Sequence, residues 1–475
     1  MIMRRAVALL TMSAAALTAC GESAIDVTVD IVGSSQANLD PFAPAVGLAV
    51  VQVYLEGEQA GTQAIVSIDP QSRTATFRGY PVDDGGVPLS VRVEGLDEQG
   101  NIVAFGRGLS APSDSNVSIQ VPLRRNFAYV THRRNEGQQQ PESYIYVLDM
   151  ATRALVEKIR LPGIQPRADR ITARGGDALL VTYRDGAQGY LGILSAEDHS
   201  WRQVALPVSQ RVALGVEGAS IGVVAGGGIV TFVDLDTAQV VGRFPEEGAR
   251  LIGGFVRDGV IAGNGQSALF ILGGAATGSV IFVDVTRQIV EPLDVVNDPA
   301  GVSLAPNGRI AYVNSGVDPS VAEVDLRNGR VARANGFARP VGMAAYSENM
   351  EAVLALDASD GSRRVLALLP RANCPEDVSQ LCGEALPVSD ATPTTELPVD
   401  LAADGVGRQI LVIGVGSSTA AAGLTLIETF GVRGQIPIGA RSLYPGDPDD
   451  TFSVGGNTLG RQRYQPQSVA IIYGR

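Results

Sequence analysis

A strand-and-turn module that recurs from Asn126 to the end of the chain constrains the fold more than any other sequence feature. Its clearest copy lies between Pro299 and Asn335, where short β-branched or aromatic runs are bounded by Gly, Pro, Asn or Asp, as in strands joined by tight turns. Asn307-Gly308 and Asn328-Gly329 mark two hairpins, because Asn-Gly supplies the positive φ angles that short hairpin turns need. The copy therefore predicts a small antiparallel sheet that must pack against neighbours of the same kind.

The copies recur at nearly regular intervals. The strand expected to be third in each copy ends at Asp149, Ser195, Asp234, Asp284, Asp325, Leu369 and Glu428, with spacings of 39 to 59 residues. A strand-only repeat of this length is typical of β-propeller blades. The longest spacing contains Cys374 and Cys382 and indicates a decorated loop, not a missed blade. The recurring Asp is expected to cap the turn to the fourth strand by accepting backbone N–H hydrogen bonds.

The order of the strands predicts how the ring closes. The repeats begin with a second-type strand at Phe127–Val130, and the missing first-type strand is at Pro466–Tyr473, which matches Pro299–Leu304. We therefore expect residues 467–473 to pair with residues 127–131, which removes the open edge of the ring. Counting first strands then predicts seven blades in residues 125–475, with first strands at about Arg170, Val212, Leu251, Val302, Val341, Val399 and Val469.

The module resembles the YVTN-type propeller repeat through Phe127-Ala-Tyr-Val-Thr131, Pro306-Asn-Gly-Arg-Ile-Ala-Tyr-Val-Asn314 and the Val-Asp turns. The resemblance extends over about 345 of the 475 residues and implies an all-β propeller fold. Such propellers mostly resemble surface or periplasmic binding and scaffold proteins, so the resemblance implies recognition and no particular reaction. Blades two, three and seven depart from the pattern; for example, Gly192–Ser195 lacks the Asp, and Gly226–Gly228 replaces the polar turn.

The first twenty residues are expected to direct export. Arg4-Arg5 precedes the uncharged stretch Ala6–Leu17, which is shorter than the roughly 20 residues of a membrane-spanning helix. The following Leu17-Thr-Ala-Cys20 resembles the lipobox of bacterial lipoproteins; an ordinary cleaved signal peptide is the alternative. The resemblance implies removal of residues 1–19, acylation of Cys20, and a short tether at residues 20–24. Such an anchor implies a bacterial cell envelope, and Gly21 favours the outer membrane or cell surface.

Residues 25–124 are expected to form a β-sandwich ahead of the propeller. Seven short segments alternate apolar and polar side chains, so each has one face to bury and one to expose: 25–31, 50–55, 64–68, 74–77, 89–96, 102–105 and 117–123. The pattern resembles the immunoglobulin-like or prealbumin-like modules that follow the anchor in many bacterial lipoproteins. We interpret the unit as a spacer that lifts the propeller off the membrane, with a dedicated ligand-binding module as the alternative.

The cysteines and the net charge restrict the partners. Cys374 and Cys382 are an even pair in an exported chain and are expected to form a disulfide in loop 371–397; free or metal-binding thiols are the alternative. The formal net charge is −13, and loss of the two arginines in residues 1–19 makes it −15. A chain this acidic, without a basic block, is a poor candidate for binding nucleic acid or anionic membrane surfaces.

Residues that enzymes need are scarce. Lysine occurs once, at Lys158, and histidine twice, at His132 and His199, which are expected to be surface or loop residues. The available His and Cys residues do not make a zinc site. The candidate Ca²⁺ ligands are Asp447, Asp449 and Asp450, although such clusters are also ordinary turns. We predict no catalytic residue and no cofactor; the alternative is a lactonase-like hydrolase with a site at the mouth of the central channel.

One set of arginines points to a ligand. The loops that lead into first strands carry Arg167, Arg211, Arg250, Arg339 and Arg463. If these loops gather at one mouth of the channel, the guanidinium groups form a partial ring that can hold a carboxylate or phosphate bidentately. The alternative is that each arginine pairs with an acid on the adjacent blade. The sequence thus predicts a lipid-anchored binding or assembly platform for a protein partner or an anionic cell-wall glycan.

Overall fold

The structure is a computed structural model of the 475-residue chain. It describes residues 23–34, 40–56, 63–82, 89–98, 100, 102–110, 115–134, 142–150, 154–245, 255–273, 279–304, 308–317, 320–335, 342–345, 350–357, 363–370, 397–403, 409–415, 423–429, 438–442, 453–454, 457–458 and 465–473. Over these residues the chain is built from strands, with one short 3-10 turn, η1 (Pro44–Val46). The described part has no helix of the length and apolarity needed to span a membrane.

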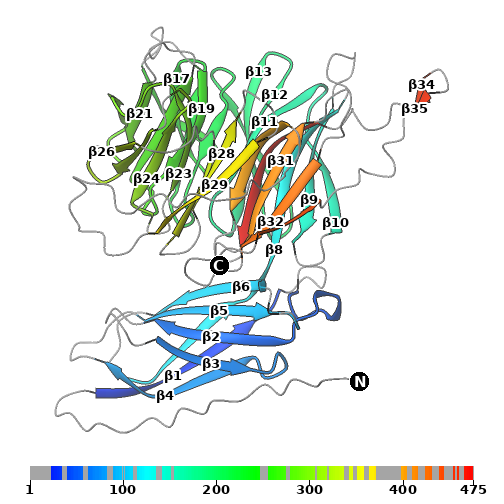
Figure 1. Ribbon diagram of the computed structural model, residues 1–475, viewed down its shortest axis with the longest axis vertical. Coiled ribbons are helices and arrows are strands. Elements are labelled where there is room, and N and C mark those ends of the chain that lie inside the picture. Colours follow the sequence, from blue (N-terminus) through cyan, green and yellow to red (C-terminus); the bar gives the residue numbers. More distant parts are fainter. Residues whose placement is uncertain are drawn as a thin grey trace.

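The described part of the chain starts with two sheets that share one core, here called the N-terminal unit (Figure 1). The first sheet has the order β4 (Thr74–Val82), β1 (Ser23–Val32), β7 (Val117–Pro122). The second contains, in order, β3 (Gln63–Ile68), β2 (Val50–Glu56), β5 (Ser90–Leu96) and β6 (Ile102–Leu109). All seven expected strands are present. Their inward faces meet in a core that includes Val27, Val29, Val53 and Val93, because alternate side chains of a strand point to the same face.

The remaining sheets repeat an antiparallel meander in which each strand pairs with the next in sequence. They are β11 (Pro166–Ala173), β12 (Ala178–Asp185), β13 (Gln188–Ser195), β14 (Trp201–Leu206); β15 (Val212–Leu214), β16 (Ile221–Gly226), β17 (Ile229–Asp234), β18 (Gln239–Phe244); β19 (Phe255–Ile261), β20 (Ser267–Gly273), β21 (Ser279–Asp284), β22 (Ile289–Leu293); β23 (Pro299–Leu304), β24 (Ile310–Ser315), β25 (Ser320–Asp325), β26 (Arg330–Asn335); β27 (Gly342–Ala345), β28 (Met350–Asp357), β29 (Arg363–Pro370); and β30 (Leu397–Ala403), β31 (Gln409–Val415), β32 (Gly423–Thr429), β33 (Ile438–Ser442). A separate small hairpin joins β34 (Ser453–Val454) to β35 (Asn457–Thr458).

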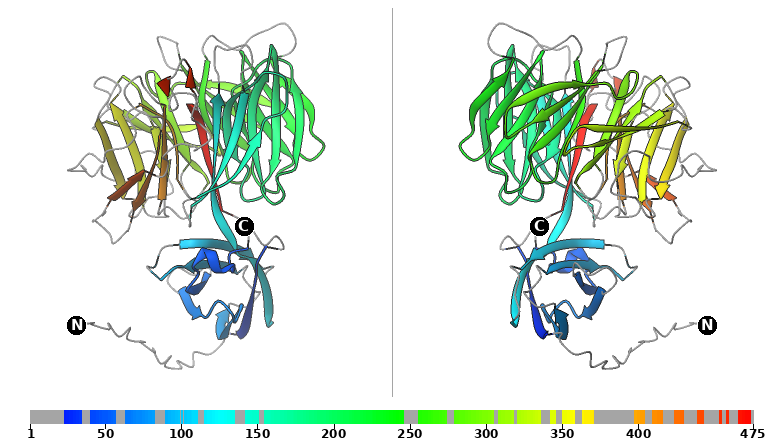
Figure 2. Two further views of the ribbon diagram at one scale, coloured as in Figure 1. Left: turned by 90° about the vertical axis from the view of Figure 1, so that its right-hand side faces the viewer. Right: turned by 90° about the vertical axis from the view of Figure 1, so that its left-hand side faces the viewer.

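These sheets are the blades of a β-propeller. Figures 1 and 2 show them standing side by side above the N-terminal unit. The first strands contact one another in a cycle, from β36 through β11, β15, β19, β23, β27 and β30 back to β36. Apolar clusters fill the spaces between neighbouring blades; one of them, for example, joins Phe232 of β17 to Phe270 of β20.

The ring closes through the last strand of the chain. β36 (Gln465–Tyr473) pairs antiparallel with β8 (Arg124–Arg134), with Val469 opposite Val130 and Ile472 opposite Phe127. The same sheet continues through β9 (Glu142–Asp149) and β10 (Ala154–Arg160). The predicted pairing of residues 467–473 with residues 127–131 is therefore present.

β8 also joins the two parts of the molecule. It runs across the predicted boundary between residues 124 and 125, and its first residues pair with β6, Arg125 opposite Ala104 (Figure 2). Ile102 and Phe105 of β6 belong to the same apolar cluster as Val130 and Val469 of the propeller. The N-terminal unit is thus attached by a continuous strand and a shared core, with no intervening linker.

The predicted turn caps are confirmed where the structure describes them. The carboxylate of Asp234 accepts the backbone N–H groups of Asp236 and Thr237 at 2.9 Å each. Asp325 accepts the N–H of Arg327 at 3.0 Å, and Gly329 in the same turn has the expected positive φ of 67°. These residues shape the turns and do not form a shared site.

One predicted first strand is centred outside the described residues. The first strand expected at about Leu251 is β19, which begins at Phe255; Leu251 lies outside the described residues. The polar run Arg257-Asp258-Gly259 has the composition of a turn, yet it lies inside β19. A β-bulge between Val256 and Asp258 accommodates the extra residue, which is why an apolar pattern search passes over this strand.

Candidate anion-binding site at the channel mouth

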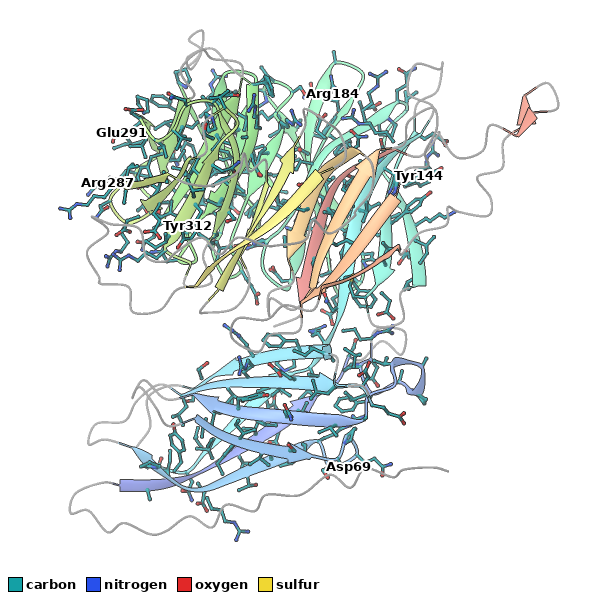
Figure 3. The ribbon with its side chains drawn as sticks, viewed as in Figure 1. Asp69, Tyr144, Arg184, Arg287, Glu291 and Tyr312 are labelled. Carbon is teal, nitrogen blue, oxygen red and sulfur yellow. The ribbon has the colours of Figure 1, made fainter. Side chains whose placement is uncertain are left out.

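A pocket of about 410 Å³ opens at one end of the central channel. We call it the cup; its charged lining residues are Arg133, Asp169, Arg184 and Arg211. The first residues of β8 lie beside the N-terminal unit, and Arg133 near its other end lines the cup. The cup therefore opens on the propeller face that points away from the N-terminal unit. Figure 3 shows Arg184 at this far end and Asp69 in the N-terminal unit.

A glycine hairpin forms one wall of the cup. Gly227 and Gly228 have φ angles of 60° and 82°, which are the two positive values that a type I′ hairpin requires. A Cβ atom on Gly226 would lie 2.6 Å from the backbone nitrogen of Arg211, so only glycine allows the hairpin to pack this closely. The glycines 226–228, which replace the polar turn of the repeat, therefore allow this wall of the cup to pack against Arg211.

Two of the cup arginines share one acid. Arg133 donates from Nε to the carbonyl oxygen of Ala168 at 2.6 Å and from Nη2 to Asp169 at 2.8 Å. The Nε atom of Arg184 lies 3.4 Å from the other oxygen of Asp169. Burial raises the pKa of Asp169, and the charges of Arg184 and Arg133 oppose that shift. One carboxylate therefore compensates two guanidinium groups.

Arg211 is the third cation of the cup. Among the described residues no acid lies within ion-pair distance of its guanidinium group, which stands 5.9 Å from the centre of the Phe255 ring. Partial burial and then the positive charge of Arg170 hold the pKa of Arg211 below its usual value. Its backbone is fixed on both sides: Thr182 donates to its carbonyl oxygen at 2.5 Å, and its N–H donates to Ala225 at 2.9 Å. The cup thus holds an excess of positive charge in a rigid frame.

A second polar cluster lies next to the cup, where four first strands meet. We call it the channel network; it contains Arg170, Asp258, Asp400 and Ser468. Nη2 of Arg170 lies 2.6 Å from Asp258 and 3.6 Å from Asp400. Asp400 also accepts the hydroxyl of Ser468 at 2.6 Å and the N–H of Val469 at 3.1 Å. Burial raises the pKa of Asp258 to about 6, against the lowering effect of Arg170.

β-bulges bring these side chains together. The pairing of β11, β19, β30 and β36 with their second strands shifts by one residue directly before Arg170, Asp258, Asp400 and Ser468. A bulge re-aims the side chains around it. Because the shift recurs at the same point of four strands, residues far apart in sequence meet at one level of the channel.

The predicted arginine ring is only partly present in the described structure. Arg211 lines the cup, whereas Arg167 lies in β11 and does not line it. The other predicted ring members and sites lie outside the described residues: Arg250, Arg339, Arg463, Cys20, Cys374, Cys382, Asp447, Asp449 and Asp450. Arg133, Arg184 and the channel network were not predicted from the sequence. A usable signal was the polar pair inside an otherwise apolar first strand, as in Asp169-Arg170 and Arg257-Asp258.

The histidines lie away from the cup. The prediction of a surface or loop position is wrong for His132, which is 2% exposed and stacks on Tyr146 with 4.2 Å between ring centres. Burial lowers its pKa to about 4, so its imidazole is neutral. His199 lies in a turn, as expected, 3.0 Å from the Tyr129 hydroxyl and 2.6 Å from Glu157. Within the described residues no three His, Cys, Asp or Glu side chains are grouped to hold a metal ion.

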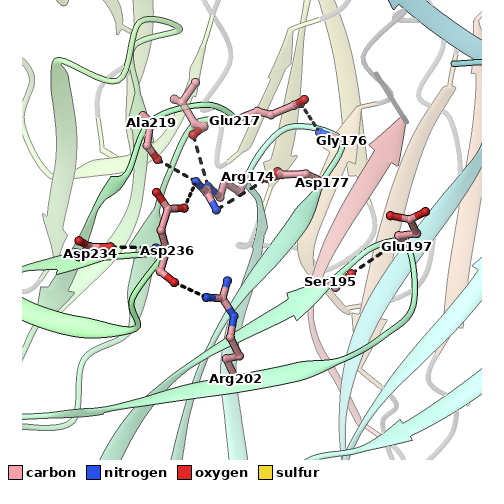
Figure 4. A network of polar contacts seen from close by, with 11 residues as sticks. Arg174, Gly176, Asp177, Ser195, Glu197, Arg202, Glu217, Ala219, Asp234 and Asp236 are labelled. Atoms are coloured by element: carbon pink, nitrogen blue, oxygen red, sulfur yellow. Dashed lines mark hydrogen bonds and ion pairs between the residues drawn. The ribbon is translucent and has the colours of Figure 1, made fainter. Parts of the chain in front are cut away.

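A smaller cavity, of about 170 Å³, lies at the end of the propeller that faces the N-terminal unit. Acids outnumber arginines in its lining, and two of its charged groups have partners: Arg125 pairs with Asp149, and Glu217 accepts the N–H of Gly176. Beside it, Arg174 donates to Ala219 and pairs with Asp236 across two blades (Figure 4). This network joins the turns of adjacent blades and leaves no excess charge comparable with that of the cup.

Comparisons with known proteins add no assignment of activity. No protein-family model and no curated protein matches the chain. Among solved structures, a protein from Desulfotomaculum acetoxidans described as functionally unknown is 14% identical, covers 74% of this chain and 100% of its own, and has a TM-score of 0.48. A putative 6-phosphogluconolactonase from Bacteroides fragilis is 11% identical, with coverage of 73% and 98% and a TM-score of 0.46. The Cps50 (Swd1) β-propeller domain from Myceliophthora thermophila is 12% identical, with coverage of 58% and 85% and a TM-score of 0.44. All three scores are below 0.5, so the propeller assignment stands on the strand pairing and the cycle of first strands described above.

Proposed function

We propose that this protein is a lipid-anchored envelope protein whose seven-bladed propeller is a non-catalytic binding platform, and that its cup takes the anionic group of a ligand. The observation that carries the proposal is the charge of the cup: among its described lining residues, Arg133, Arg184 and Arg211 accompany one acid, Asp169. The blade number is supported by the cycle of first strands. The N-terminal unit, of immunoglobulin-like or prealbumin-like type, serves as a rigid spacer, supported by the continuous strand β8.

The geometry suits a carboxylate or phosphate. A guanidinium group offers paired donors that match two oxygens of such a group, and charge-assisted bonds are about twice as strong as neutral ones. Because the backbone of Arg211 is already fixed by Thr182 and Ala225, little ordering is needed on binding. The protein as a whole is acidic, with a formal net charge of −13, so a local excess of arginine is a feature of this site and not of the surface in general.

Replacing Arg211 tests the site. Arg211→Ala is expected to weaken binding of inorganic phosphate or an acidic oligosaccharide about 10- to 100-fold, since a hydrogen bond to a charged group contributes about 1.5–3 kcal/mol. Isothermal titration calorimetry at low salt measures the change. Arg287→Ala is the matched control, because Arg287 is 75% exposed and lies at the outer edge of the propeller (Figure 3). Equal affinities of the two variants, or no anion binding by the native protein, would contradict the proposal.

Lipid anchoring has its own test. Cys20→Ser is expected to move the protein from the membrane fraction to the soluble fraction of the cells that produce it, because the acylated sulfur is lost. Cell fractionation and the mass of the mature N-terminus give the readout, with Cys382→Ser as the control that keeps the anchor. A Cys20→Ser protein that remains in the membrane fraction would show that Cys20 is not the anchor.

A hydrolase is the second candidate, favoured by the two carboxylates of the channel network. Burial raises the pKa of Asp258 to about 6, whereas Asp400 is held by two hydrogen bonds from β36. Carboxyl groups in such different environments can divide the roles of acid and base. Hydrolysis of sugar lactones by the native protein and by Asp258→Asn discriminates the candidates: activity lost in the variant supports a hydrolase, and background rates in both support the binding platform.

A further inference from the structure

Exposed apolar side chains lie at the cup and beside its lining residues. Phe255 is 53% exposed and lines the cup, and Val208 is 37% exposed and packs on Gly227 of the glycine wall. Ile164 is 83% exposed; its N–H donates to Asp185, the residue after Arg184. We call Phe255, Val208 and Ile164 the apolar rim. Phe255 begins β19, Val208 precedes β15 and Ile164 precedes β11, so the three side chains come from the entrances to three different first strands.

The apolar rim differs from the exposed apolar residues of the fourth strands. Val156 lies in β10, Val240 and Val241 in β18, and Ile289 in β22, all on fourth strands at the outer edges of blades. Single exposed apolar side chains at such edges are normal. The rim residues instead stand around the pocket with the positive charge. Ligand sites combine apolar surface with a few placed polar groups, so a charged cup beside exposed apolar side chains suits a ligand that carries both an anionic and an apolar group.

The ring of Phe255 lies close to two arginines. The guanidinium groups of Arg211 and Arg257 stand 5.9 and 5.6 Å from its centre. Cation–π contacts of this kind hold the ring and both cations in place, and the exposed part of the ring remains available to a ligand. Charge and apolar surface are therefore presented together at one point of the cup wall.

Resting on the proposed function of the cup, we propose that its ligand is a segment of a protein partner, in which a carboxylate enters the cup and neighbouring apolar side chains cover the rim. The carboxylate pairs with Arg211 and Arg184, whose charges exceed that of Asp169. A volume of about 410 Å³ accommodates a residue or two of a chain and not a folded domain. A phosphate group or an acidic polysaccharide satisfies the arginines but has no apolar side chains to cover the rim.

The test compares three probes on the full-length protein and its variants. The probes are an array of hexapeptides that alternate Asp or Glu with apolar residues, inorganic phosphate, and polygalacturonate. The native protein is expected to bind acidic peptides from the array, and Ile164→Ser and Phe255→Ser to weaken that binding at least about 10-fold. Phosphate affinity is expected to stay within about twofold in both variants. Val241→Ser, which changes an exposed valine of β18, is the control and is expected to leave all affinities unchanged.

The outcomes separate the inference from the proposed function. Arg211-dependent binding of phosphate or polygalacturonate without peptide binding would overturn the inference and leave the anion-binding function in place. Peptide binding that is insensitive to both rim variants would also overturn it. No Arg211-dependent binding of any probe would overturn the proposed function itself.

Discussion

Deletion of residues 465–475 is expected to abolish the cooperative unfolding transition of the propeller. β36 supplies Val469, Ala470, Ile471 and Ile472, each 8% exposed or less, to two different apolar clusters. Its loss leaves β8 with an open edge and removes the neighbour that lies between β11 and β30. Because the strand comes from the far end of the chain, no local segment can replace it. The deleted protein should appear as aggregate or as a broad, non-cooperative urea transition.

Point substitutions make the same test quantitative. Ile471→Ala and Ile472→Ala are each expected to lower the free energy of unfolding by about 2–5 kcal/mol, the range for truncating a buried isoleucine. Fluorescence of Trp201, the one tryptophan, follows unfolding in urea. Ile164→Ala is the control, because Ile164 is 83% exposed and its truncation should cost nothing measurable. An unchanged urea midpoint for the two core variants would mean that β36 does not close the ring.

The strand plan was predictable because its signals are local. Alternating apolar residues and Asn-Gly or Asp turns recur within each copy, so residues 229–234 or 320–325 could be assigned without knowing their neighbours. Closure by β36 was also predictable, since Pro466–Tyr473 repeats a first-strand pattern that the first copy lacks. The attachment of the N-terminal unit through β8 was not predictable, because no local sequence pattern indicates that Ala104 and Arg125 pair.

The site was less predictable, because bulges and the convergence of blades create it. Arg257-Asp258-Gly259 has the composition of a turn, so it was not expected inside a strand, and Asp258 was overlooked. Arg133 and Arg184 lie at the ends of second strands in different blades, and only the ring brings them to one carboxylate. Arg211 was found because it directly precedes a first strand, a position that topology alone places at the channel mouth.

The channel network is expected to make stability depend on pH through Asp258. Its pKa of about 6 in the folded protein lies above the ordinary value of 3.8. Stability from this group is therefore fully present below about pH 4 and is lost as the pH rises through about 6. The difference between the two pKa values corresponds to a loss of stability on the order of 3 kcal/mol. Urea unfolding of the native protein and of Asp258→Asn between pH 4 and 7.5 measures it, and the variant should show a flatter profile.

The positive charge of Arg170 lowers the pKa of Asp258 and so limits the loss of stability at high pH. Removing Arg170 should therefore change stability more than Asp258→Asn does. Arg170→Met leaves Asp258 and Asp400 together without their shared partner, which is expected to cost about 3–5 kcal/mol at pH 7.5. The cost should be smaller at pH 4.5, because the pKa of Asp258 rises further without Arg170 and the carboxyl then keeps its proton. The double variant Arg170→Met/Asp258→Asn is the decisive control: removing the unpaired carboxylate should restore part of the stability at pH 7.5. An equal loss at both pH values, with no recovery in the double variant, would mean that Arg170 acts through packing and not through the charges of the channel.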